Sequence, residues 1–333
     1  MHMADALVSP AVAATMYVCS GAVIGTSIVK LRQEDDAKKI PVMGVMGAFV
    51  FAAQMINFTI PGTGSSGHLC GGLLLSALLG PWAGFLTTAC VLLIQCLFFA
   101  DGGLLALGCN IWNMAFYGCF IGSLFIWRPL MKGGATKGRI LLASVLGSVL
   151  TLQLGAFSVS LETLASGITE LPFSVFIATM QPIHLAIGLV EGLITAAVLC
   201  FIYDARPELL WGVGDGNASS AGKLSFPVTL GILAAGSALI GGVISLFASS
   251  LPDGLEWSME KVAGTAELVA EGGAYDAAAG LQEATSFLPD YALKGSESAI
   301  GTTISGLVGA TLVVVLCLFL CYLLRFFRKK ARA

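Results

Sequence analysis

The chain has 333 residues, of which 56% are hydrophobic and only 11% are charged, with a formal net charge of −3. Soluble domains carry about 25% charged residues, so this composition excludes a water-soluble globular domain. The apolar runs are long and continuous instead of alternating over segments of about ten residues, which favours an all-α polytopic membrane protein over a β-barrel.

Nine apolar runs follow one another along the chain, and each is a candidate membrane span. They lie near residues 11–31, 41–58, 69–80, 82–100, 103–127, 139–161, 174–203, 227–250 and 303–325. The run at 69–80 is short for a span of about 20 residues, so it is either re-entrant or longer than it reads.

The placement of basic residues predicts an orientation with the N-terminus outside and the C-terminus inside. With nine spans, the inner segments hold fifteen Lys and Arg residues, whereas the outer segments hold only Lys261 and Lys294. This is the asymmetry that the positive-inside rule describes. Removing one span from the count would exchange the inside and outside assignment of every later segment. The outer segments are acidic, which raises the local concentration of cations, although acids also fill whichever loops basic residues avoid.

The chain divides into two predicted units. We expect a seven-span unit over 1–203, a cytoplasmic linker over 204–223 and a two-span unit over 224–333. The outer loop of the second unit, 251–302, contains PDGLEWSMEK and is long for a simple connection. Loops of this length are usually functional or disordered.

The N-terminus, MHM, is a candidate chelating group. The α-amine of Met1, the amide nitrogen of His2 and its ring Nδ1 can hold one metal ion through unstrained five- and six-membered rings. Ni(II) and Cu(II) accept such tetragonal nitrogen geometry best, and three nitrogens leave one corner of a square plane open. The plain alternative is an incidental histidine beside a loose chain end.

The loop AAQMINFTIPGTGSSGHLCGG joins the second and third runs on the same outer side and ends near His68, the candidate for the fourth corner. Irregular backbone at membrane depth is tolerated only where it is buried in protein or lines a cavity. Ligand histidines need hydrogen-bonding partners around them, and Gln54, Asn57 and Ser66 are the candidates.

Nucleotide binding is not expected of this chain. The loop before His68 fits GxGxxG literally, but that fingerprint needs a preceding strand in a βαβ unit. The sequence also has no GxxxxGK[ST] phosphate loop, so we expect no ATP hydrolysis by this chain alone. Nothing predicts binding of nucleic acid.

Two further pairs are separated by helical spacings. His184 and Glu191 lie seven residues apart in the run at 174–203, hence on one helix face. Ionisable residues in a span face the interior or a cavity. This polar pair is therefore a structural lock, a proton or ion relay, or the centre of an intramembrane enzyme, although HExxH is absent. Gly21 and Gly25 have the GxxxG spacing that permits close helix packing, either to a partner subunit or within the chain.

Four stretches in order resemble one transporter family. MHMADAL, FVFAAQMINFTIPGTGSSGHLCGG, LFFADGGLLALGCNIWNMAF and QPIHLAIGLVEGLITA are similar to the CbiM/NikM-type substrate-capture permeases of nickel and cobalt energy-coupling-factor (ECF) ABC transporters. PDGLEWSMEK resembles their small companion subunit, here fused to the C-terminus. The resemblance implies that Met1, His2 and His68 bind the metal in a square plane.

The resemblance also implies a function and partners. We expect a metal-uptake component in the cytoplasmic membrane of a prokaryote, not an enzyme, working with a transmembrane coupling subunit and two cytoplasmic ATPase subunits. Square-planar nitrogen ligation predicts Ni(II) as the substrate. The alternative is Co(II), feeding cobalamin biosynthesis, and a purely structural scaffold subunit is a further hypothesis.

Overall fold

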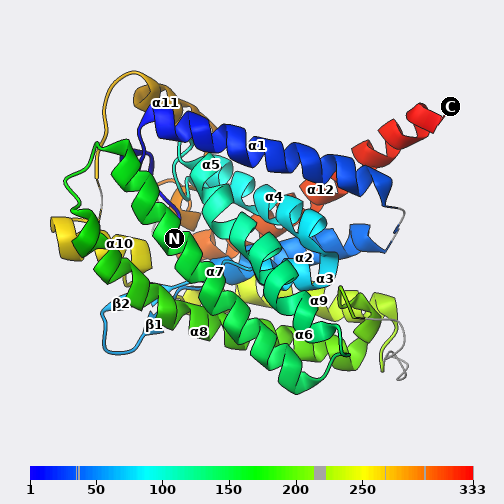
Figure 1. Ribbon diagram of the computed structural model, residues 1–333. Coiled ribbons are helices and arrows are strands. Elements are labelled where there is room, and N and C mark those ends of the chain that lie inside the picture. The colour runs from blue at the N-terminus through cyan, green and yellow to red at the C-terminus, as the bar shows by residue number, and fades with distance from the viewer. Residues whose placement is uncertain (35, 37, 214–222, 267, 296–297, 333) are drawn as a thin grey trace.

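The computed structural model describes residues 1–333 apart from 35, 37, 214–222, 267, 296–297 and 333. The chain folds as a helical bundle that carries one small β-hairpin among the described residues (Figure 1). The longer helices are α1 (Pro10–Gln33), α2 (Lys39–Gln54), α4 (Pro81–Phe99), α7 (Lys137–Ser166), α8 (Phe173–Ala205), α9 (Phe226–Gly242) and α12 (Ala299–Arg332).

Shorter elements connect and cap these helices. They are the strands β1 (Phe58–Ile60) and β2 (Ser65–Gly67), the helices α3 (Gly72–Leu79), α5 (Leu107–Asn110), α6 (Arg128–Met131), α10 (Gly254–Ala263) and α11 (Ala274–Thr285), a π-helical segment over Ile111–Trp127, and 3-10 turns at Asp5–Leu7, Pro207–Leu209, Ile244–Phe247 and Pro289–Tyr291.

The prediction of an all-α polytopic membrane protein is confirmed. Within the described residues, six helices are long and apolar enough to cross a membrane: α1, α4, the continuous helix Leu107–Met131, α7, α8 and α12. Two shorter apolar helices, α2 and α9, account for two more of the nine apolar runs.

The third run, 69–80, does not form a full-length spanning helix. Its helix, α3, has eight residues and rises only about 12 Å, against a hydrocarbon thickness of about 30 Å. All eight residues are buried. The end of α3 lies beside the segment that follows α8, where the Trp211 amide donates to the Ala77 carbonyl (2.8 Å). The chain therefore enters the bundle through the irregular residues between β2 and α3, and α3 continues it to the segment that follows α8.

The helices of the second predicted unit share the core of the first. Helices α9 and α12 cross at Gly241 and Gly306, where a Cβ on Gly306 would overlap the Gly241 main chain. Both helices pack against α2, and α12 also contacts α4. In the predicted linker, residues 214–222 lie outside the described part, so the boundary between the units stays a prediction.

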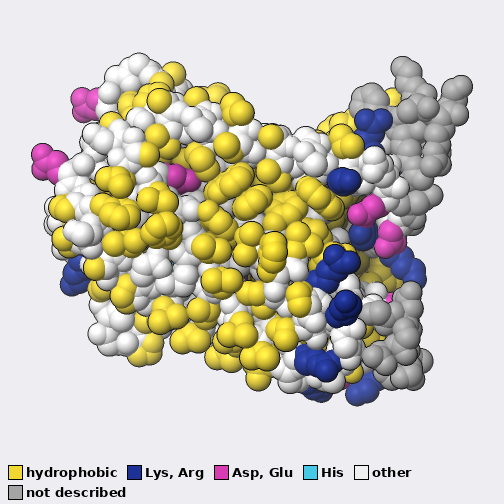
Figure 2. Space-filling view, in the orientation of Figure 1, with side chains coloured by type: hydrophobic (Ala, Val, Ile, Leu, Met, Phe, Trp, Pro, Cys, Tyr) yellow, Lys and Arg dark blue, Asp and Glu magenta, His cyan; other side chains and the backbone are white. Residues whose placement is uncertain are grey.

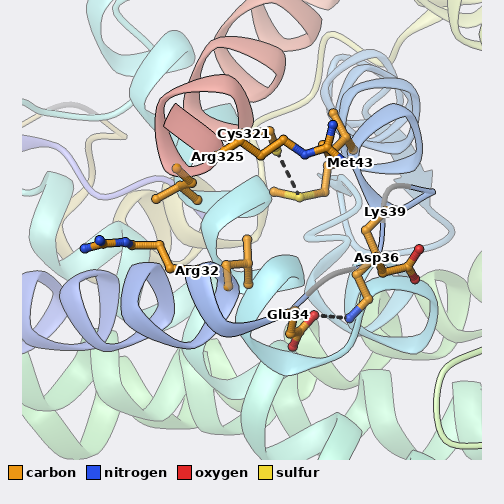
Figure 3. Close-up of a pocket in the computed structure, with 10 residues that line it drawn as sticks. Arg32, Glu34, Asp36, Lys39, Met43, Cys321 and Arg325 are labelled. Carbon is orange, nitrogen blue, oxygen red and sulfur yellow. Dashed lines mark hydrogen bonds and ion pairs between the residues drawn. The ribbon is translucent and has the colours of Figure 1, made fainter. Parts of the chain in front are cut away.

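Charge is separated along the bundle. Most of the visible Lys and Arg side chains gather at one end, a broad apolar surface follows, and the N-terminus lies toward the other end (Figures 1 and 2). This is the distribution that the positive-inside rule predicts. A small pocket of about 50 Å³ lies at the basic end between the α1–α2 connection and α12, where Lys39 pairs with Glu34 and the Cys321 thiol donates to Met43 (Figure 3).

Candidate metal centre

The N-terminus is inserted into the bundle and held there. Met1 is only 4% exposed, and Met3 is fully buried. The Asn110 side chain brackets residue 3, because its Oδ1 accepts from the Met3 amide (2.7 Å) and its Nδ2 donates to the Met3 carbonyl (3.1 Å). The Gly103 amide donates to the same carbonyl (2.9 Å). The chain end is therefore fixed by specific hydrogen bonds.

The Met1 amine lies 2.7 Å from Nε2 of His68. Nδ1 of His68 lies 3.1 Å from the Leu69 carbonyl, which can only accept, so Nδ1 carries the ring proton and Nε2 presents its lone pair to the amine. Two nitrogens bound at right angles at about 2.0–2.1 Å from a metal lie about 2.9 Å apart. The observed separation is close to that of two adjacent ligands.

The ring of His2 stacks on that of His68, with ring centroids 5.1 Å apart. Nδ1 of His2 lies 3.1 Å from a carboxylate oxygen of Asp101, and Nε2 lies 3.3 Å from Oε1 of Gln95. Because the Asp101 carboxylate can only accept, Nδ1 carries the proton of the neutral ring here, and binding a metal through Nδ1 requires that this proton move to Nε2, beside Gln95. Burial lowers the pKa of His2 to about 4, although Asp101 opposes the shift, so the ring is neutral near pH 7 and able to bind a metal.

Asp253, from the loop of the second unit, forms an ion pair with the Met1 amine and lies 3.6 Å from Nε2 of His68. Burial disfavours charge on the amine, but Asp253 outweighs that effect and raises the pKa of the amine above its ordinary value. Burial likewise disfavours the carboxylate, yet the neighbouring amine holds the pKa of Asp253 well below its usual range. Both groups are therefore charged.

The backbone after His68 is clamped from two sides. The amides of Cys70 and Gly71 donate to the Glu191 carboxylate (2.8 and 3.1 Å), and Nε2 of Gln54 donates to the Cys70 carbonyl (2.9 Å). Gln54 was predicted to bind near the ligand histidine, and it does so through the main chain two residues further on. Glu191, a buried carboxylate of α8, therefore positions the loop that carries His68.

The loop of the second unit docks on the hairpin that precedes His68. Ser66 donates its amide to the Pro252 carbonyl (2.8 Å), the Asn57 carbonyl accepts from Ser249 (2.7 Å), and the Trp257 indole donates to the β1–β2 turn (3.0 Å). Ser66 and Asn57, predicted as partners of His68, thus bind this loop instead. Asp253 itself caps α10 in a capping box with Glu256.

A cavity of about 620 Å³ opens beside these groups. His2 and His68 line it together with five carboxylates, those of Asp5, Asp101, Asp253, Glu256 and Asp290. Such a concentration of carboxylates attracts cations to the nitrogen groups beneath. Among the described residues no three His, Cys, Asp or Glu side chains are grouped as a conventional metal site.

The structure bears on the alternatives left open for the other two predicted pairs. His184 and Glu191 do not pair, because Glu191 accepts from the Cys70–Gly71 backbone while Nδ1 of His184 bonds the Met180 carbonyl (2.8 Å). Gly21 and Gly25 face open space, because a Cβ added at either position would have no described atom within 4 Å, so they do not mediate packing within the chain.

Comparison with known families gives two matches along the chain. A family described as "Cobalt uptake substrate-specific transmembrane region" (CbiM) matches residues 2–209, and one described as "PDGLE domain" matches residues 228–326. The crystal structure of a truncated transition metal transporter is also similar, with a TM-score of 0.54 at 31% identity over 61% of this chain and 98% of that chain.

Similar proteins include fused and single-unit relatives. A putative fused nickel transport protein NikMN of Archaeoglobus fulgidus is 35% identical over 95% of this chain and 96% of its own length. The fused nickel transport protein NikMN of Rhodobacter capsulatus is 30% identical, over 94% of this chain and 95% of its own. The cobalt transport protein CbiM of Sorangium cellulosum is 34% identical over 56% of this chain and 83% of its own.

Proposed function

Because the chain belongs to the CbiM family of cobalt-uptake substrate-specific transmembrane regions and carries a PDGLE domain after it, we propose that it captures Ni(II) for an ECF-type ABC transporter. The chain is a multi-pass membrane component of a metal transporter, not an enzyme, so the intramembrane enzyme that His184 and Glu191 suggested is set aside.

The observation that carries the proposal is the buried N-terminal amine, 2.7 Å from a lone-pair nitrogen of His68. With the amide nitrogen and Nδ1 of His2, the amine of Met1 and Nε2 of His68 make four nitrogens. Four nitrogens in a plane suit Ni(II), whereas Co(II) is less suited to that geometry. Co(II), feeding cobalamin biosynthesis, is the alternative substrate, since relatives carry names of both kinds.

The acidic cavity would supply the ion to this site. Its five carboxylates hold cations near the opening, and the nitrogens then exchange their protons for the metal. The family resemblance implies that inward release requires a transmembrane coupling subunit and two cytoplasmic ATPase subunits, and the sequence, which has no phosphate loop, agrees with that. We place the complex in the cytoplasmic membrane of a prokaryote, with residues 1–203 as the capture unit, 204–223 as the linker and 224–333 as the companion unit.

A single added residue before Met1 tests the ligand set. It converts the terminal amine into an amide and moves the new amine away from His68, so Ni(II) affinity should fall by at least about a hundredfold. The measurement is Ni(II) titration of the purified full chain, with the same residue added at the C-terminus as the control. Unchanged affinity in the N-terminally extended protein would show that the proposed site is wrong.

A further inference from the structure

His184 presents a buried nitrogen lone pair that no described residue satisfies. The side chain lies in α8 and is only 1% exposed. Its Nδ1 is 2.8 Å from the Met180 carbonyl, which can only accept, so Nδ1 carries the proton of the neutral ring. Nε2 therefore holds the lone pair, and it has no hydrogen-bond partner among the described residues. Leaving such a buried group unpaired is unfavourable, so its retention calls for an explanation.

The main chain of the PDGLE loop lies directly on this nitrogen. A Cβ on Gly254, the first residue of α10, would lie 3.2 Å from Nε2 of His184 and 2.8 Å from the Ile187 side chain. The preceding residue, Asp253, pairs with the Met1 amine. Two consecutive residues of this loop thus approach the His184 lone pair and the proposed nitrogen ligands, Gly254 the first and Asp253 the second.

An additional imidazole matters differently for the two candidate ions. Ni(II) is satisfied by four nitrogens in a plane, whereas Co(II) gains from further ligands outside the plane. We propose that Nε2 of His184 is an additional ligand position for the transported ion, covered by Gly254 and used by Co(II) but not by Ni(II) when the loop moves aside. The inference rests on the ligand set proposed above.

The fused loop then controls which ion the site prefers. With Gly254 seated on His184, only the four-nitrogen set is accessible, and the site favours an ion that accepts a square plane. With the loop withdrawn, a fifth nitrogen becomes accessible, and the disadvantage of Co(II) decreases.

The test uses the purified full chain with its native N-terminus, titrated separately with Ni(II) and Co(II) salts under anaerobic conditions. His184→Phe keeps a ring of similar size but removes the lone pair, and His184→Ala is the second variant should the first fail to fold. Thr195→Ala is the matched control, because Thr195 lies on the same helix, is fully buried and has a hydroxyl without a described partner. We expect His184→Phe to weaken Co(II) binding at least about tenfold and Ni(II) binding less than about threefold. The visible absorption of bound Co(II) should shift with the loss of a ligand, and Thr195→Ala should change neither ion.

Each other result overturns a specific step. Equal weakening of both ions would assign His184 to packing, and unchanged Co(II) affinity with an unchanged spectrum would remove it from the coordination sphere. If the unmodified protein binds neither ion, the proposed function fails first. If it binds Ni(II) and only the His184 result is negative, the inference fails alone.

Discussion

Lowering the pH should weaken Ni(II) binding steeply, because metal and protons compete for the same nitrogens. Asp253 raises the pKa of the Met1 amine above its ordinary value of about 8, so at neutral pH the metal must displace a proton there. The amide of His2 releases a second proton. The pKa of the His2 ring, lowered by burial to about 4, adds no third proton above about pH 5. Affinity should therefore fall about a hundredfold, or about 2.7 kcal/mol, per pH unit from the amine pKa down to about 5.

Competition against a chelator at pH 6, 7 and 8 measures this slope, and calorimetry in buffers of different ionisation enthalpy counts the protons directly. In Asp253→Asn, burial lowers the pKa of the amine against only the weaker opposition of Cys70 and Asp101, so the slope should approach one proton near pH 8. Glu256→Gln is the control, because Gln also completes a capping box and leaves the Asp253 carboxylate in place. A slope of zero or one proton in the unmodified protein would refute the amine-and-amide ligand set.

Three further changes test how the site is held. Glu191→Ala leaves two buried amides after His68 unsatisfied, so we expect a loss of about 2–6 kcal/mol in unfolding free energy and about 10–100-fold weaker Ni(II) binding, measured by thermal unfolding and titration. Gly306→Ala drives a methyl group into the Gly241 main chain and should destabilise the fold by about 1–3 kcal/mol, whereas Gly231→Ala, with open space around it, should not. Trp257→Phe removes one hydrogen bond to the β1–β2 turn and should weaken loop docking by about 1 kcal/mol, seen as faster hydrogen exchange over 251–266; unchanged exchange would show that the bond contributes nothing.

The apolar helices were predictable because they depend on local sequence. Apolar runs of 20 residues become helices in lipid whatever they pack against. The third run was harder to predict, since its twelve mostly apolar residues do not indicate that only Gly72–Leu79 would be helical. The apolar character of residues 69–80 predicts that they are buried. The two residues just before α3, Cys70 and Gly71, instead donate their amides to Glu191, a contact that the local sequence does not indicate.

Contacts between distant parts of the chain could not be predicted from the sequence. The spacing Asp253-x-x-Glu256 predicts the start of a helix, as observed, but nothing local shows that the same carboxylate reaches Met1, 252 residues away. His184 and Glu191 were placed correctly on one buried face. A shared helix face determines the direction in which two side chains point, but it does not determine their hydrogen-bond partners. Two helical turns separate His184 from Glu191, and each bonds a different segment.

Charge explains why a carboxylate from the second unit suits both states of the proposed site. The metal-free site holds one positive charge, the ammonium of Met1, which Asp253 balances. Ni(II) brings two positive charges, and the deprotonated amide of His2 cancels one, so four nitrogens around Ni(II) again carry a single positive charge. Burying one unbalanced charge costs several kcal/mol, so the partner of the ammonium must remain near the metal complex as well. Asp253 therefore needs only to shift from the amine proton to the face of the Ni(II) complex, so we expect the loop that carries it to stay on the capture unit while Ni(II) is loaded.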